Sequence, residues 1–205
     1  MKHKKLLVWA IIILIWYIIT IPSLQLVEEV LVPSPKKVIE TFISLCKDGY
    51  NNIPLTEHLG ASFGRLFASI ALAIITAVPL GLLCGYITKI ETLISTIVDF
   101  IRPLPPLAYY TLIILWLGIG NTSKIVLLYI AAFAPIYIAC VQAVKLVRTD
   151  YVLSAKTLGA TNFQIFTHVV LPSTLPNIFT GIRTATGVAY TTLVSSEMIA
   201  AVSGI

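Results

Sequence analysis

The chain has 205 residues, of which 58% are hydrophobic and 11% are charged, and its mean hydropathy is +0.94. About a quarter of the residues of a soluble domain are charged, so this composition excludes a soluble globular protein and indicates an integral membrane protein. The formal net charge is +5, but the Lys and Arg residues do not cluster as on a nucleic-acid-binding surface. The lipid bilayer is therefore an expected partner, and nucleic acid is not.

Uncharged stretches predict the membrane spans. A helix needs about 20 residues to cross a bilayer, and four uncharged stretches are long enough. A fifth stretch, 184–202, is apolar except for Glu197 and scattered Thr and Ser residues. The sequence therefore predicts an all-α membrane protein, a polytopic helical bundle with five spans. The four uncharged stretches are 6–27, 66–88, 103–123 and 125–144.

The first stretch follows Lys2, Lys4 and Lys5. A basic head before an apolar run is also typical of a cleavable signal peptide. The run is longer than a signal peptide needs, and Pro22-Ser23-Leu24 lacks the small residues of a cleavage site. We therefore expect residues 1–31 to form an uncleaved signal-anchor span.

The placement of Lys and Arg predicts the orientation of the spans. With the N-terminus inside, most of these residues fall in cytoplasmic segments, as the positive-inside rule requires. Lys89 and Arg102 are then assigned to the cytoplasm and Arg65 to the outside. The prediction is a multi-pass protein of the cell membrane with its N-terminus inside.

Residues 32–58 are predicted to form an extracytoplasmic connection before a membrane-embedded core at 59–205. Ser34 and Pro35 are typical of an N-cap and a first helical position. Apolar residues then recur at helical spacing up to Cys46. We expect an amphipathic helix that lies on the membrane surface or packs on the spans, in preference to a substrate site.

The second span carries small side chains at every fourth position. Such a face lets two helix backbones approach closely in lipid. Packing within the chain and an interface between subunits fit this pattern equally well. The helix-packing face consists of Ser69, Ala73, Ala77, Gly81 and Gly85.

The third span opens with Arg102-Pro103-Leu104-Pro105-Pro106. This run cannot form regular helix, because proline lacks a backbone donor and favours extended geometry in the residue before it. We expect a rigid elbow there. Irregular backbone at membrane depth is tolerated beside protein or a water-filled cavity, so Tyr109 and Tyr110 are candidates for lining a pathway. An aromatic belt at the interface is the alternative interpretation.

Residues 150–180 are too polar and too rich in proline for a span. Gly159 is expected to end a first short amphipathic helix, and Thr161 and Gln164 form the capping box of a second. Pro172 and Pro176 are expected to interrupt the chain after that second helix. The prediction is a cytoplasmic loop of two short helices, which has the character of a docking surface.

Within the predicted spans, Glu197 is the formally charged residue, with Ser195 near it in sequence, and Gln142 is a second polar residue. Intramembrane ionisable groups face a cavity or a partner. A structural or gating role for Glu197 is favoured over substrate contact, although the ammonium group of a zwitterion is a conceivable partner. These residues join Tyr109 and Tyr110 as candidates for the pathway or its gate.

Several kinds of chemistry find no support in the sequence. Cys46, Cys84 and Cys140 stand far apart, without the spacing of metal ligands, so no metal site is expected. The chain has no glycine-rich phosphate-binding loop, so it is not expected to bind ATP itself. An intramembrane enzyme needs paired acids, a His cluster or a nucleophile with its base, and no catalytic residue is predicted.

The docking loop carries a family resemblance. Residues 153–160, Leu-Ser-Ala-Lys-Thr-Leu-Gly-Ala, and the pairs Leu171-Pro172 and Leu175-Pro176 resemble the EAA signature of permease subunits of binding-protein-dependent ABC importers. The resemblance extends from about residue 32 to the end. It departs from the signature at 153–155, where Ala155 alone is kept from Glu-Ala-Ala.

A second segment resembles one branch of that family. The run from Arg102 to Ala108, the segment Trp116-Leu117-Gly118-Ile119-Gly120 and Phe133-Ala134-Pro135 resemble the taurine, sulfonate and nitrate branch, and within it the taurine permeases most closely. The implied fold is that of a type I ABC importer permease. Members of the family have a further span after the position of Ile205, so a sixth span is expected to be missing through truncation.

The resemblance also implies partners. These are a separate ATP-binding subunit, a second permease copy in a homodimer, and an extracytoplasmic substrate-binding protein. No cofactor is expected in this chain, because the partner binds the ATP. The residues expected to contact the ATP-binding subunit are Leu153, Ser154, Ala155, Lys156, Leu158, Gly159, Ala160, Pro172 and Pro176.

The implied function is ATP-driven import of taurine or a related small sulfonate. The same machinery could carry nitrate, another alkanesulfonate or a small heterocycle, because a binding protein makes most of the selection. A passive channel or an intramembrane enzyme is the alternative from a different class. A passive channel would have no need of a loop that docks an ATPase.

Overall fold

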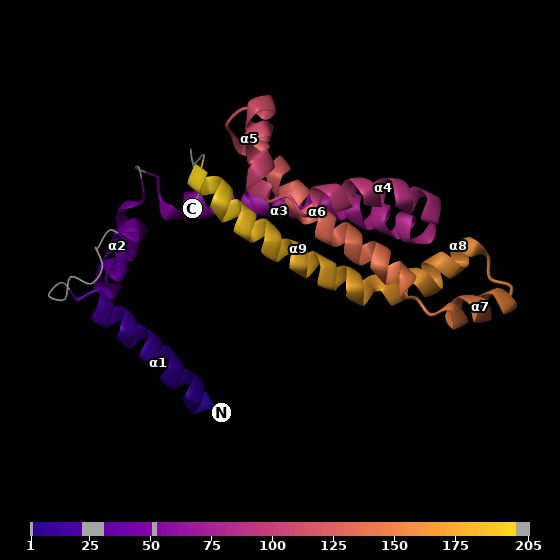
Figure 1. Cartoon of the computed structure of the whole chain (residues 1–205), viewed down its shortest axis with the longest axis horizontal. Coiled ribbons are helices and arrows are strands. Elements are labelled where there is room, and N and C mark those ends of the chain that lie inside the picture. Colours follow the sequence, from indigo (N-terminus) through magenta and orange to yellow (C-terminus); the bar gives the residue numbers. More distant parts are fainter. Residues whose placement is uncertain (1, 22–30, 51–52, 200–205) are drawn as a thin grey trace. The chain divides into compact units, whose positions relative to one another are not determined.

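The computed structural model describes residues 2–21, 31–50 and 53–199, and all named elements in these ranges are helices (Figure 1). The predicted all-α membrane fold is confirmed. The chain divides into two compact units, Met1–His58 and Leu59–Ile205, which we describe separately. The division of function into residues 1–31, 32–58 and 59–205 stays a prediction.

The first unit contains α1 (Lys2–Ile19) and α2 (Pro35–Asp48). The predicted start of α2 is confirmed, because the Lys37 backbone N–H donates to Ser34 Oγ at 3.4 Å and Pro35 is the first helical residue. In α1 the apolar part is Leu7–Ile19, which is shorter than a bilayer-crossing helix. The remainder of the predicted span 6–27 includes residues 22–27, which lie outside the described residues.

Within the described residues, three helical segments are long and apolar enough to cross a membrane: α3 (Leu55–Tyr86), α6 (Asn121–Lys145) and the stretch Asn162–Ile199. The spans predicted at 66–88 and 125–144 correspond to α3 and α6. The predicted start of this span at residue 66 is wrong, because α3 begins at Leu55 and Arg65 is buried within it, whereas the assignment of Arg65 to the outer side stays a prediction. A carboxylate from another helix compensates its charge, so the charge does not mark the end of the helix.

The span predicted at 103–123 is wrong in its extent. The structure has α4 (Thr88–Ile101) and α5 (Pro106–Leu117), which are bent by 98° and can together form one broken span. The predicted elbow is confirmed between them. Residues 88–101 form α4, an amphipathic helix whose Glu91 forms an ion pair with Lys145 of α6, and the assignment of Lys89 and Arg102 to the cytoplasmic side stays a prediction.

The prediction of two short helices in residues 150–180, the docking loop, is confirmed in part. The loop contains α7 (Thr149–Thr157), ended at Gly159 with φ +83°, and α8 (Asn162–Ile165), which starts with the predicted capping box of Thr161 and Gln164. The prediction of a short second helix is wrong. From α8 the chain continues through the π-helical turn η1 (Phe166–Val170) into α9 (Leu171–Ile199).

Pro172 and Pro176 therefore lie inside a helix and do not interrupt it. The wider turn explains this for Pro172, because the Leu171 backbone N–H donates to Phe166 O, five residues back. A π-turn relieves the ring clash that proline causes in a regular helix. The last span thus begins well before the predicted residue 184, and residues 200–202 of that prediction lie outside the described residues.

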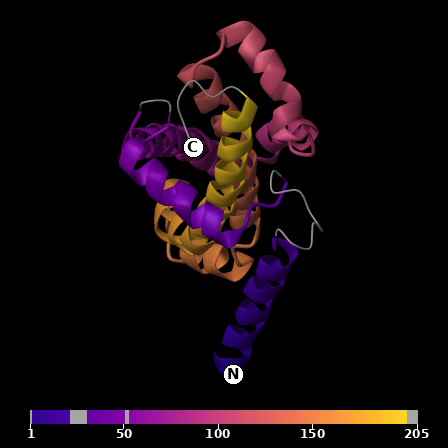
Figure 2. The same ribbon diagram turned by 90° about the vertical axis from the view of Figure 1, so that its left-hand side faces the viewer.

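Helix α6 lies between α3 and α9. Ser69 Oγ of α3 donates to Ile125 O of α6, and Gly81 lies against Cys140, so α3 and α6 run in the same direction. Helix α9 returns beside α6 in the opposite direction, as both views show (Figures 1 and 2). The small-residue face predicted on the second span thus packs against α6 of the same chain.

Gly81 provides a test of this packing. A Cβ on Gly81 would lie 2.6 Å from Cys140 Cβ, whereas a Cβ on Gly64 of the same helix would have nothing within 4 Å. Overpacking costs about 1–3 kcal/mol. Gly81→Val is therefore expected to lower the melting temperature of the detergent-solubilised protein relative to Gly64→Val, which has the same change in helix propensity. Equal melting temperatures would contradict the packing of α3 on α6.

Candidate functional site

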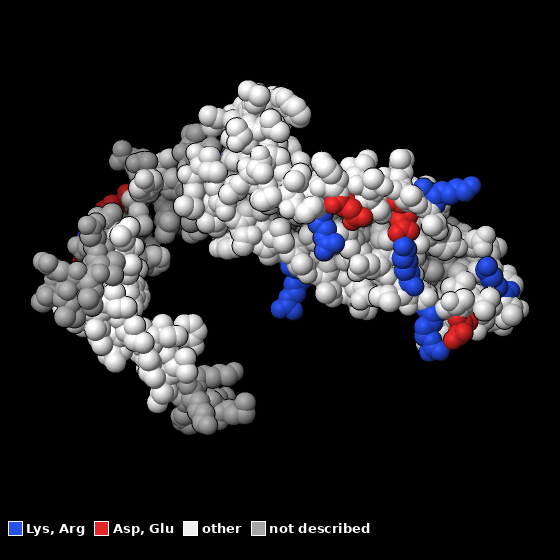
Figure 3. Space-filling model, in the orientation of Figure 1, with Lys and Arg blue, Asp and Glu red and all other residues white. Residues whose placement is uncertain are grey.

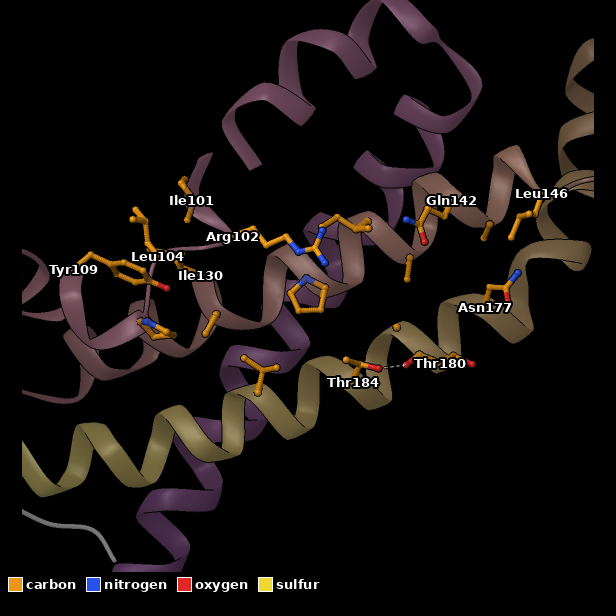
Figure 4. A pocket seen from close by; sticks show the side chains of 18 residues that line it. Ile101, Arg102, Leu104, Tyr109, Ile130, Gln142, Leu146, Asn177, Thr180 and Thr184 are labelled. Atoms are coloured by element: carbon orange, nitrogen blue, oxygen red, sulfur yellow. Dashed lines mark hydrogen bonds between the residues drawn. The ribbon is translucent and has the colours of Figure 1, made fainter. Parts of the chain in front are cut away.

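A cavity of about 530 Å³ lies between α6, α9 and the elbow that joins α4 to α5. It forms an open groove along the middle of α6 and α9, and apolar side chains make most of its wall (Figure 4). Polar side chains from each of these elements point into it. They are Arg102, Tyr109, Gln142, Asn177, Thr180 and Thr184.

Local sequence features give the groove its shape. The prolines of the elbow turn the chain by 98° and bring Arg102 and Tyr109 to one wall. Gly181 lets α9 approach α6 closely, because a Cβ there would collide with Ala139 Cβ. The residues at 177, 180, 181, 184 and 188 recur at helical spacing, so one face of α9 forms the opposite wall.

The predicted pathway residues separate into two groups. Tyr109 and Gln142 line the groove. Tyr110 is 1% exposed and packs in a cluster with Ile113 and Leu127, and Ser195 donates its hydroxyl to Thr191 O. These two residues and Glu197 are not among the described residues that line the groove.

Glu197 lies in a buried polar cluster instead. It is 1% exposed and forms an ion pair with Arg65, with 2.6 Å between Arg65 Nη1 and Glu197 Oε1. Ser62 Oγ lies 2.8 and 3.0 Å from the two carboxylate oxygens, and Arg65 Nε donates to Asn121 Oδ1 at 2.8 Å. The cluster joins the early part of α3 and the start of α6 to the end of α9.

A second hollow, of about 430 Å³, lies between α7 and the α8–η1 segment. The backbone N–H groups of Gly159 and Ala160 donate to Lys156 O and Ala155 O, which closes the turn. Among the predicted contact residues, Ala155, Leu158, Gly159 and Ala160 line the hollow, while Leu153, Ser154 and Lys156 are exposed. Pro172 and Pro176 lie outside it, in α9.

The turn between α7 and α8 exposes large apolar side chains. Leu158 is 88% exposed and Phe163 is 75% exposed. Two large, strongly exposed apolar side chains beside one turn suit a contact with another protein. Charged side chains of the second unit gather toward this end, whereas the visible surface near α5 is almost free of them (Figure 3). This distribution suits a water-exposed docking hairpin, by which we mean residues 149–165.

Four of the polar residues that line the groove were not predicted from the sequence. Arg102 was counted only for the orientation of the spans, although its position before the proline run was a usable signal for the groove. Asn177, Thr180 and Thr184 fell in the segment interpreted as a polar loop. Their helical spacing becomes informative once Pro172 and Pro176 are placed inside a helix.

Comparisons with known proteins agree with this architecture. Residues 77–205 match the family described as binding-protein-dependent transport system inner membrane component. The taurine transport system permease protein TauC of Escherichia coli is 36% identical over 197 residues, which cover 96% of this chain and 71% of TauC. The putative aliphatic sulfonates transport permease protein SsuC of Bacillus subtilis is 33% identical over 202 residues, which cover 98% and 71%.

The bicarbonate transport system permease protein CmpB of Synechocystis is 31% identical over 139 residues, which cover 68% of this chain and 50% of CmpB. These relatives are transporter permeases. The resemblance found in residues 102–135 and 153–176 is confirmed, as is the placement beside taurine and sulfonate permeases. The chain therefore belongs to the family of inner membrane components of binding-protein-dependent transport systems, the permeases of ABC importers.

Proposed function

We propose that this chain forms the translocation pathway of an importer for taurine or a related small sulfonate, driven by ATP hydrolysis on a separate subunit. The observation that carries the proposal is the continuity of α8, η1 and α9. One helical segment, Asn162–Ile199, holds both the docking hairpin's second helix and the groove residues Asn177, Thr180 and Thr184. A displacement of the hairpin therefore moves a wall of the groove.

The other subunits of the proposed transporter are inferred from the family. Two copies of the permease would pair, two ATP-binding subunits would dock on their hairpins, and a binding protein would deliver cargo from outside. ATP binding would close the ATPase pair and move α8. The π-turn at Phe166–Val170 and the two prolines are the points where the segment can bend without losing its helical course.

The orientation is part of the proposal. With the N-terminus inside, α3 and α6 run from the outside to the cytoplasm and α9 returns. The docking hairpin then lies in the cytoplasm, where ATP is available, and the Arg65–Glu197 pair lies toward the outside. A structural role for Glu197 follows from its pairing, and substrate contact at Glu197 is not needed.

Uptake by cells tests the cargo. The experiment uses cells that lack sulfonate importers of their own and that express the permease together with its ATP-binding subunit and its binding protein. We expect accumulation of radiolabelled taurine, competed by unlabelled alkanesulfonates and lost when the ATP-binding subunit is omitted.

Three other outcomes are informative. If nitrate or a heterocycle competes with taurine and sulfonates do not, the cargo is of a different class, while the assignment as an ATP-driven importer is retained. Uptake that persists without the ATP-binding subunit would support a passive channel. Chemical conversion of taurine by the purified permease would support an enzyme.

A further inference from the structure

The groove holds a charge to which the proposed function gives no role. Arg102 comes from the elbow between α4 and α5 and reaches toward α6, on the same cavity that Gln142 and Thr184 line (Figure 4). Among the described residues that line the groove, Arg102 is the one with a formal charge. Helix α4 has 14 residues, so the elbow lies about 21 Å along the helix axis from Thr88. Arg102 itself is exposed.

This guanidinium has no acidic partner in the described part of the chain. Ion pairs there join Lys36 to Glu40, Arg65 to Glu197, Lys145 to Glu91 and Arg148 to Asp150. Arg65, by contrast, is buried against its carboxylate. A charged side chain at membrane depth is costly unless it faces water or a counter-charge, and such residues mark ion and substrate pathways.

The other polar groups of the groove divide by their hydrogen-bonding capacity. The hydroxyls of Thr180 and Thr184 donate their hydrogens to Pro176 O and Thr180 O of their own helix. Toward the groove, these two hydroxyls can therefore only accept hydrogen bonds. Arg102 can only donate, whereas Tyr109, Gln142 and Asn177 can both donate and accept. The groove thus has a cationic donor at the elbow and acceptor oxygens of Thr180 and Thr184 on α9.

We propose that Arg102 holds the anionic head of the cargo as it crosses the groove. The inference rests on the proposed function. The planar guanidinium fork matches two oxygens of an oxyanion, and a groove with low-dielectric walls strengthens the attraction. The ammonium end of a zwitterion would face the acceptor oxygens of Thr180 and Thr184. Arg102 would also repel cations.

Substitution of Arg102 tests the assignment in the complete transporter, reconstituted with its ATP-binding subunit and binding protein. Arg102→Gln is expected to lower taurine uptake at least about tenfold, equivalent to about 1.4 kcal/mol. Arg102→Lys keeps the charge and should retain more uptake than Arg102→Gln. Arg183→Gln is the matched control, because Arg183 is exposed on α9 outside the described lining of the groove. Each variant should retain the ATP-binding subunit on purification.

A second readout separates charge from folding. Arg102→Cys would be made in a Cys46→Ser background, since Cys46 is exposed while Cys84 and Cys140 are buried. A methanethiosulfonate reagent forms a mixed disulfide with the new thiol and releases methanesulfinate. The aminoethyl reagent, which restores a cation, should raise taurine uptake, and the sulfonatoethyl reagent should not.

The outcomes are distinct. Taurine uptake at the wild-type rate by Arg102→Gln overturns the assignment, as does an equal response of Arg102→Cys to the two reagents, including no reaction with either. Absence of ATP-dependent uptake by the wild-type complex overturns the proposed function, and this inference with it.

Discussion

Replacing Gly159 by Arg is expected to abolish co-purification of the ATP-binding subunit with the permease. Gly159 adopts φ +83°, which is strained for any residue with a side chain, and it lines the hollow of the docking hairpin. The substitution therefore both disturbs the turn and places a long cation on the proposed contact surface. Ala155→Asp, which puts a carboxylate into the same hollow, should have the same effect. Affinity purification followed by quantification of the two subunits measures the result.

Gly118→Arg is the matched control for Gly159→Arg. Gly118 has φ +77°, and a Cβ there, as at Gly159, would have nothing within 4 Å. Backbone strain is thus comparable, but Gly118 lies between α5 and α6, away from the hairpin. Retention of the ATP-binding subunit by the Gly159→Arg and Ala155→Asp variants, with normal membrane insertion, would show that the hairpin is an ordinary connection.

Replacing Glu197 by Ala is expected to destabilise the permease strongly. The change leaves Arg65, which is 4% exposed, buried without its carboxylate. Removing one partner of a buried ion pair costs about 3–5 kcal/mol, whereas replacing both partners with apolar residues of similar volume is often neutral or stabilising. The melting temperature in detergent should therefore fall for Glu197→Ala and recover in the Arg65→Met, Glu197→Met double variant.

An exposed pair supplies the comparison for Glu197. Lys36 and Glu40 are 3.7 Å apart with side chains 83% and 63% exposed, and such pairs contribute about 0–1 kcal/mol. Glu40→Ala should thus leave the melting temperature nearly unchanged. A Glu197→Ala variant as stable as Glu40→Ala would mean that the Arg65–Glu197 pair does not hold α3 to α9.

The sequence predicted best the uncharged central parts of the spans. The run 125–144 locates most of α6, but the helix begins at Asn121 and includes Lys124, a buried charge at which the prediction had ended the span. Helix α4 was missed because Lys89, Glu91 and Asp99 make its sequence look like a water-exposed connection. Its charge at Glu91 is paired with Lys145 of α6, a residue far away in sequence. Only the fold reveals that pairing.

Prolines account for the error in the last span. Pro172 and Pro176 were interpreted as helix breakers, as their missing donors would suggest in a regular α-helix. The π-turn before them changes the hydrogen-bond register, so the helix continues. No local pattern in the sequence predicted the π-turn.

Pairings over long sequence separations limited the prediction of the site. Tyr109 was named for the pathway because it follows the proline elbow and Gln142 because it is polar within a span, and both line the groove. Glu197 was also chosen as a polar residue within a span, but its partner Arg65 is 132 residues away in sequence, and no local pattern joins the two. Arg102 was not considered for the pathway, because counting charges by topology treats each cation as a loop residue.

In the proposed transporter, ATP hydrolysis by a partner subunit, received at the docking hairpin, drives cargo through the groove. The most direct measurement is taurine uptake into proteoliposomes that contain the permease, its ATP-binding subunit and its binding protein, with either ATP or a non-hydrolysable analogue supplied to the ATP-binding subunit. We predict uptake against a gradient with ATP and none with the analogue. Equal uptake under the two conditions, running only down the taurine gradient, would contradict the account.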